Sequence, residues 1–245
     1  MNESRAESDR RGRAEPPVVE LSSDDPAPMF LGRLAHDLRG PLSPLQTAAY
    51  LLRREDVGPQ RKGELLDIID RQTARLGSML QEMSDWMRAR KGNVGTRREP
   101  VNAPLLIELA CGGLVAAGGA VVLPEELDEV EILGDTQHLV QMLTTFVDYM
   151  QSQSRGAGIR VAASRKGDGL EVVIEMLDSQ AGESFVESFD TLFIAPQPVP
   201  FDEGLGLRLL IARAIVVAHA GSISAATTAS GHGGMVLQLP IMAAR

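Results

Sequence analysis

The feature that most constrains this chain is an apolar stripe of helical period near its N-terminus. Between residues 28 and 54, apolar side chains recur at steps of three and four, at Leu31, Leu34, Leu38, Leu42, Leu45, Ala49 and Leu52. This spacing predicts one face of a long helix that packs against other helices. The same stretch holds His36 and Asp37 side by side, with Pro41 and Pro44 after them. A proline removes a helical hydrogen bond and kinks a helix, so stability alone does not explain this segment.

A second stretch, residues 60–90, has an even more regular apolar pattern. Its stripe alternates steps of three and four without a break, at Leu66, Ile69, Thr73, Leu76, Leu80, Met83 and Met87. Residues 56–59 between the two stretches read as a turn, so the two helices should form an antiparallel hairpin. Two hairpins together make a four-helix bundle, and we therefore predict a homodimer. The alternative is a monomeric hairpin folded against the rest of the chain.

Composition narrows the remaining possibilities. Residues 1–27 are rich in Arg, Glu, Asp, Ser and Pro, and we predict a disordered tail there. A net charge of −9 argues against nucleic-acid binding. The chain has no run of about eighteen apolar residues, so we expect no membrane insertion. The single cysteine, Cys111, is consistent with a reducing compartment, and we expect a cytoplasmic protein.

Beyond the glycine-containing linker at 91–95 the pattern changes to alternating helices and strands. Helices are predicted at 105–117, 136–153 and 205–218, and Asp135 is a candidate cap for the second of them. Strands are predicted at 120–123, 129–133, 159–164, 170–177, 222–226 and 235–240, and a proline-rich loop at 183–203. This order predicts an α/β sandwich with one helical layer on a mixed sheet.

The run from His36 to Leu42 resembles the phosphoacceptor box of sensor histidine kinases, which reads roughly His-Glu/Asp-Leu-Arg-Thr/Asn-Pro-Leu. Six of the seven positions fit, and Gly40 is the exception. The resemblance implies a dimerisation and phosphoacceptor domain at 28–92, in which His36 carries a phosphoryl group and Asp37 holds the imidazole ring. It implies a response-regulator receiver domain as partner. Because the chain has no room for a sensory module, a separate sensor protein is expected to supply the signal.

Residues 100–245 resemble the gyrase-type ATPase domain of the same kinases. The phosphate loop of that domain corresponds to Gly204, Leu205, Gly206 and Leu207, where glycines let the backbone approach phosphate and a helix N-terminus offers N–H groups. The alternative is that these glycines only permit tight helix–sheet packing. The adenine box corresponds to Asp178–Gly182: Asp178 would accept the adenine amino group and Gly182 is the retained glycine, while Gln180 replaces the other. Capping of a strand end is the alternative role for Asp178.

The magnesium ligand of that family, an asparagine, corresponds to Tyr149. A tyrosine is a poor ligand for Mg²⁺, so no metal ligand is assigned, and ATP with Mg²⁺ is expected to support only reduced kinase activity. The sequence thus predicts a histidine kinase-like two-component signalling protein, in which His36 passes a phosphoryl group to a response-regulator aspartate. Two alternatives stay open. One is a histidine phosphotransferase or pseudokinase adaptor with a decayed ATP site, and the other is a dimeric scaffold without catalysis.

Overall fold

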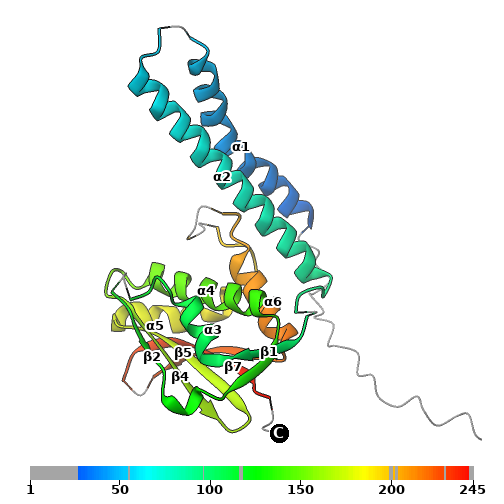
Figure 1. Cartoon of the computed structure of the whole chain (residues 1–245), viewed down its shortest axis with the longest axis vertical. Coiled ribbons are helices and arrows are strands. Elements are labelled where there is room, and N and C mark those ends of the chain that lie inside the picture. The colour runs from blue at the N-terminus through cyan, green and yellow to red at the C-terminus, as the bar shows by residue number, and fades with distance from the viewer. Residues whose placement is uncertain are drawn as a thin grey trace, which may run out of the picture.

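The computed structural model describes residues 27–54, 56–95, 97–115, 118–198, 201, 204–228 and 230–242. The tail predicted to be disordered lies outside the described residues, except for Ala27, which begins the first helix. Helix α1 (Ala27–Leu52) and helix α2 (Pro59–Arg90) form an antiparallel hairpin that stands on a layered α/β part (Figure 1). Within these described ranges, no helix is both long enough and apolar enough to span a membrane.

The hairpin forms where the apolar periodicity predicted it, and its helix ends differ from the predicted ones by at most two residues. Its interior contains Ala48, Leu65 and Met79, each at most 2% exposed. Helix α2 begins with Pro59 at its first turn, where the missing N–H of proline costs nothing. Helix α1 continues through Pro41 and Pro44.

The α/β part contains a five-stranded sheet and a short two-stranded ribbon. The sheet runs in the order β2-β4-β5-β7-β6, with β2 parallel to β4 and the other neighbours antiparallel. Its strands are β2 (Ala120–Val122), β4 (Ile159–Lys166), β5 (Gly169–Met176), β6 (Ser222–Thr227) and β7 (Gly233–Pro240). The ribbon consists of β1 (Glu99–Asn102) and β3 (Glu131–Gly134), which pair in antiparallel fashion. It lies where the chain enters the α/β part.

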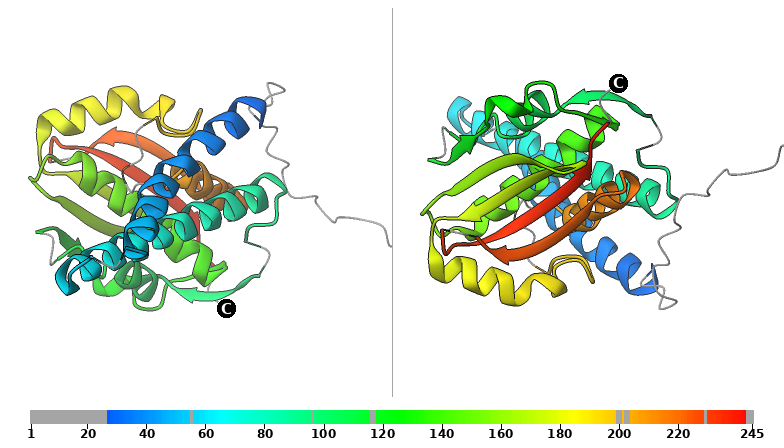
Figure 2. Two further views of the ribbon diagram at one scale, coloured as in Figure 1. Left: turned by 90° about the horizontal axis from the view of Figure 1, so that it is seen from above. Right: turned by 90° about the horizontal axis from the view of Figure 1, so that it is seen from below.

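Helices cover one face of the sheet and leave the other face open (Figure 2). They are α3 (Ala103–Ala110), α4 (Thr136–Gln153), α5 (Ser179–Ser188) and α6 (Arg208–Ala218), with short 3₁₀ turns at Glu125–Leu127 and Phe189–Thr191. Fully buried side chains such as Phe146 of α4, Ile215 of α6 and Leu237 of β7 form the core between the layers. The predicted fold class, a helical hairpin followed by an α/β sandwich with one helical layer, is confirmed.

Three local predictions were wrong. Residues 183–203 are not all loop, because α5 occupies their first part. Asp178 caps α5 by accepting the Ala181 N–H at 2.9 Å, and the prolines that suggested a loop come after the helix. Helix α6 begins at Arg208 rather than Leu205, because Gly206 has a φ of +76°, which an α-helix does not allow. Helix α3 ends at Ala110 instead of residue 117.

The linker between hairpin and α/β part is anchored around His219. The His219 ring is 2% exposed; its Nδ1 lies 2.8 Å from the Ile215 carbonyl and its Nε2 3.2 Å from the Asp135 N–H. Since one nitrogen donates and the other accepts, the ring is neutral. Burial lowers the pKa of His219. A Cβ on Gly95 would lie 2.8 Å from this ring, so the linker passes directly over it.

Candidate functional site

His36 lies on the outer surface of the hairpin, where its side chain is 83% exposed. Its Nδ1 is 3.2 Å from Oδ1 of Asp37, whose side chain is 28% exposed. A carboxylate can only accept a hydrogen bond, so Nδ1 is the donor, and in the neutral form of the ring Nε2 carries the free lone pair. The arrangement therefore presents a nucleophilic nitrogen to solvent, with the opposite nitrogen held by an acid.

The backbone around His36 is unusual in ways that the sequence explains. Pro41 has no N–H for the Asp37 carbonyl one turn earlier, and Pro44 has none for that of Gly40. A Cβ added to Gly40 would meet nothing within 4 Å, so the glycine is not required by packing. The surface one turn after His36 therefore carries no side chain at position 40.

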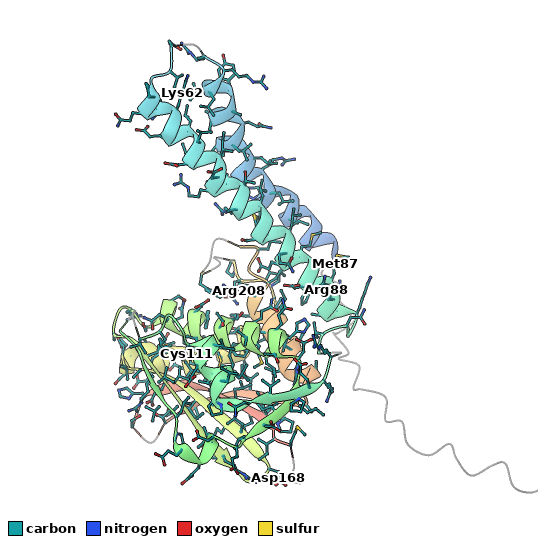
Figure 3. All side chains as sticks on the ribbon, in the orientation of Figure 1. Lys62, Met87, Arg88, Cys111, Asp168 and Arg208 are labelled. Atoms are coloured by element: carbon teal, nitrogen blue, oxygen red, sulfur yellow. The ribbon has the colours of Figure 1, made fainter. Side chains whose placement is uncertain are left out.

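The loop Gly204–Leu207 lies immediately before α6, at the junction with the hairpin; Figure 3 marks this junction with Arg208, Met87 and Arg88. The Leu205 and Leu207 side chains are buried, at 2% and 0% exposure, which leaves the backbone to face the junction. A Cβ on Gly206 would lie 2.4 Å from the Gln197 carbonyl oxygen, so only glycine fits there. The Gln197 N–H donates to the Gly206 carbonyl at 2.9 Å and fixes the loop.

The N–H groups of this loop converge on a carboxylate from α2. Oε2 of Glu82 accepts the Leu205 N–H and Oε1 accepts the Leu207 N–H, both at 2.6 Å. Glu82 is only 7% exposed. The sequence interpretation missed this residue because it followed a single apolar stripe on α2. A second stripe with the same steps, at Leu65, Ile68, Gln72, Arg75, Met79, Glu82 and Trp86, contains Glu82 among its members.

Tyr149 lies in an aromatic cluster formed by α4, α5 and the segment that follows α5. Its ring is 6.4 Å from that of Phe185 and 5.6 Å from that of Phe201, centroid to centroid, and the cluster continues to Phe189 and Phe193. Tyr149 itself is 7% exposed. Tyr149, the residue that the sequence resemblance matched to a metal ligand, is therefore a packed aromatic ring.

The neighbouring acid, Asp148, is held by an arginine. Its carboxylate lies 3.2 Å from the Arg208 guanidinium, which also stacks 5.2 Å above the Phe201 ring. The described residues contain no cluster of three or more His, Cys, Asp or Glu side chains able to hold a metal ion. The donor set around Tyr149 consists of phenyl rings and one ion-paired carboxylate, and it does not fit Mg²⁺, which needs hard oxygen ligands.

Asp178 and Gly182 have structural roles in this arrangement. Asp178 caps α5, as described above. A Cβ on Gly182 would lie 2.6 Å from the Gly233 N, so this glycine lets α5 approach β7 closely. Gln180 is exposed, and its amide oxygen lies 3.4 Å from Arg155. The structure thus separates the nucleotide-site candidates into two groups: the backbone of the loop Gly204–Leu207 donates to Glu82, and Asp178–Gly182 begins a helix.

Comparisons with known proteins found matches to the helical hairpin and to most of the chain. Residues 29–92 match the family model described as the His Kinase A (phospho-acceptor) domain. The sensor protein KdpD of Mycobacterium tuberculosis is 28% identical over 225 residues, covering 86% of this chain but 25% of KdpD. The chain thus spans about a quarter of that relative's length.

Two solved histidine kinases share the fold. The full-length kinase ShkA in complex with AMPPNP aligns with a TM-score of 0.55 and 19% identity, over 89% of this chain and 46% of ShkA. The histidine kinase ThkA in complex with the response regulator TrrA aligns with a TM-score of 0.61 and 14% identity, over 89% of this chain and 62% of that one. The chain is thus similar to sensor histidine kinases in its phosphoacceptor segment and along most of its length, and it shares their fold.

Proposed function

We propose that His36 accepts a phosphoryl group and passes it to an aspartate of a response-regulator receiver domain. The observation that carries this proposal is the exposed His36 ring with its Nδ1 on Asp37. A lone pair at Nε2, facing solvent, is what an incoming phosphoryl donor requires. The solved complex of ThkA with TrrA supports a receiver domain as the partner.

The transfer conserves atoms and charge with the groups present. Nε2 of His36 attacks phosphorus, the bond from phosphorus to the donor oxygen breaks, and the donor keeps the electron pair. Asp37 holds the Nδ1 proton, which stabilises the positive charge that develops on the ring. A carboxylate oxygen of the receiver then attacks phosphorus, the N–P bond breaks, and its electron pair returns to Nε2.

The functional unit in this proposal is a homodimer. The outer stripe of α2, the one from Leu66 to Met87, is only partly covered in the single chain: Leu66, Leu80 and Met87 are 52%, 55% and 49% exposed, and its other apolar members are half-buried. The inner stripe, by contrast, is covered by α1 and the α/β part, as the burial of Leu65 and Met79 shows. One helix with two apolar faces needs a second partner, and a second copy of the hairpin supplies a matching surface.

We further propose that transfer from ATP to His36 is slow. ShkA was solved with AMPPNP, which supports nucleotide binding at this fold, and the loop Gly204–Leu207 offers N–H groups suited to phosphate. Among the described residues no acidic cluster suited to Mg²⁺ lies around Tyr149, and Asp148 is ion-paired with Arg208, whereas phosphoryl transfer from ATP relies on that ion. The buried Tyr149 ring favours the second candidate, a histidine phosphotransferase that receives its phosphoryl group from another phosphorylated protein. A separate sensor protein as the source of the signal stays a prediction.

Two labelling reactions test these proposals. The full chain is incubated either with γ-labelled ATP and Mg²⁺ or with a receiver domain charged from labelled acetyl phosphate. We expect acid-labile, base-stable label from the receiver and little from ATP. His36→Gln should abolish the label, whereas His232→Gln, a control at the residue before β7, should retain it. Label that survives in His36→Gln would refute the acceptor assignment, and rapid labelling from ATP would refute the weak kinase.

A further inference from the structure

Glu82 is a buried carboxylate on which two backbone N–H groups converge. Both contacts, from Leu205 and Leu207, are 2.6 Å long, which is typical of charge-assisted hydrogen bonds. Each carboxylate oxygen takes one of the two N–H groups, so the pair acts as a two-point clasp. A carboxylate at 7% exposure is unfavourable unless its partners compensate for lost hydration.

Packing alone does not explain an acid at this position. Position 82 lies between Met79 and Trp86 on the inner stripe of α2, and both of these side chains pack in the core shared with the α/β part. An apolar residue at 82 would continue that stripe. Other contacts already join the two parts: the Gln141 side chain on α4 donates to Asp85 at 3.1 Å. What Glu82 adds is its hold on the loop.

The groups that Glu82 binds are suited to anions in general. The N–H groups of Leu205 and Leu207 precede the first turn of α6, where the helix dipole favours negative charge. Gly206, with its φ of +76°, turns the chain between them so that both reach the same carboxylate. A phosphate group would present oxygen acceptors to the same two donors, so a phosphate and Glu82 exclude each other.

We propose that Glu82 is an internal anion that occupies the phosphate loop, and that nucleotide phosphates compete with it for the N–H groups of Leu205 and Leu207. The inference rests on the proposed assignment of this loop to phosphate. While Glu82 accepts these two N–H groups, the α/β part stays packed against α2 and the loop cannot bind nucleotide phosphates. Release of Glu82 exposes the N–H groups of the loop and at the same time weakens the packing of the α/β part on α2. The contact is therefore autoinhibitory.

The test compares the full chain with its Glu82→Gln variant. Glutamine has the same shape, but it offers one acceptor oxygen and turns an NH₂ group toward the other N–H donor. Leucine is labelled with ¹⁵N, and amide hydrogen exchange at Leu205 and Leu207 is followed by NMR. Binding of ADP is measured by calorimetry. We expect both amides to exchange about tenfold to a hundredfold faster and ADP to bind about tenfold more tightly, as loss of a charge-assisted bond predicts.

Asp85→Asn is the matched control. It removes one negative charge from the next turn of α2 and weakens the hydrogen bond from Gln141, because an amide oxygen replaces a carboxylate as the acceptor. We expect it to leave Leu205 and Leu207 protected and to change ADP affinity by less than about threefold, since the Asp85 charge is paired with Arg88 at 3.8 Å and does not bind the loop. Circular dichroism establishes that each variant is folded.

The outcomes separate the inference from the proposed function. Unchanged amide exchange in Glu82→Gln would overturn the clasp. Faster exchange without tighter ADP binding would overturn the competition. An equal gain in ADP affinity for Asp85→Asn would also overturn it, since charge alone would then be responsible. Failure of the proposed function appears elsewhere, as the absence of label on His36 from a phosphorylated receiver domain, a reaction that does not involve the loop.

Discussion

Replacing Tyr149 with asparagine, the residue that the resembled family has at this position, should destabilise the α/β part. The ring is 7% exposed and contacts Phe185 and Phe201. Removing a buried aromatic side chain costs about 3–5 kcal/mol through lost burial and the cavity left behind. Since domains of this size are stable by only about 5–15 kcal/mol, the loss is a large fraction of the total.

The measurement is urea unfolding followed by far-UV circular dichroism and by fluorescence of Trp86, the one tryptophan. Tyr149→Phe is the control: it keeps the ring and should cost less than about 1 kcal/mol. If Tyr149→Asn unfolds within about 1 kcal/mol of the unmodified chain, the aromatic cluster does not stabilise the fold and the argument fails. The same variant should gain no Mg²⁺-dependent nucleotide binding, because Asp148 is still held by Arg208.

Three other outcomes follow from burial and exposure. Because the pKa of His219 is lowered in the folded state, the unfolded chain binds a proton more readily. The free energy of unfolding should therefore fall as the pH drops below about 6.5. In urea unfolding, His219→Gln should lose less stability than the unmodified chain between about pH 7.5 and 5.5. Burial raises the pKa of Cys111 to about 11, so a thiol reagent at about pH 8 should label it only in urea, and rapid labelling of the native chain would contradict that burial. Leu80→Glu, on the outer stripe of α2, should convert a dimer to a monomer in light scattering, while Glu64→Gln should not.

The hairpin and most of the sheet could be predicted from the sequence because local patterns determine them. Steps of three and four specify the helices, and Asp135 caps α4 as its position predicted, accepting the His138 N–H at 3.1 Å. Helix α5 was not predictable in this way. Its stability depends on the cap from Asp178 and on burial of Phe185 against elements distant in sequence. Three prolines close behind it suggested a loop instead.

The candidate site likewise has one part that the local sequence predicts and one part that it does not. His36 and Asp37 are neighbours in sequence, so their contact follows from the helix that carries them. The clasp joins residues more than a hundred positions apart, and no local pattern reports it. Its one sequence signal is an acid, Glu82, between the apolar residues Met79 and Trp86 of the inner stripe. A charge at a core position of a heptad indicates a specific partner, and here that partner is backbone N–H.

The acceptor and donor halves of phosphotransfer have different structural requirements, and this chain meets them unequally. The acceptor half needs an exposed imidazole in the correct tautomer, which Asp37 alone secures. The donor half needs phosphate, metal and base sites in register, and in the proposals above Tyr149 occupies the metal position while Glu82 occupies the phosphate loop. Tyr149 lies in the α/β part and Glu82 lies where that part packs on α2. Neither residue is therefore part of the surroundings of His36. The two proposals are therefore compatible, because slow transfer from ATP does not prevent exchange of a phosphoryl group between His36 and a receiver domain.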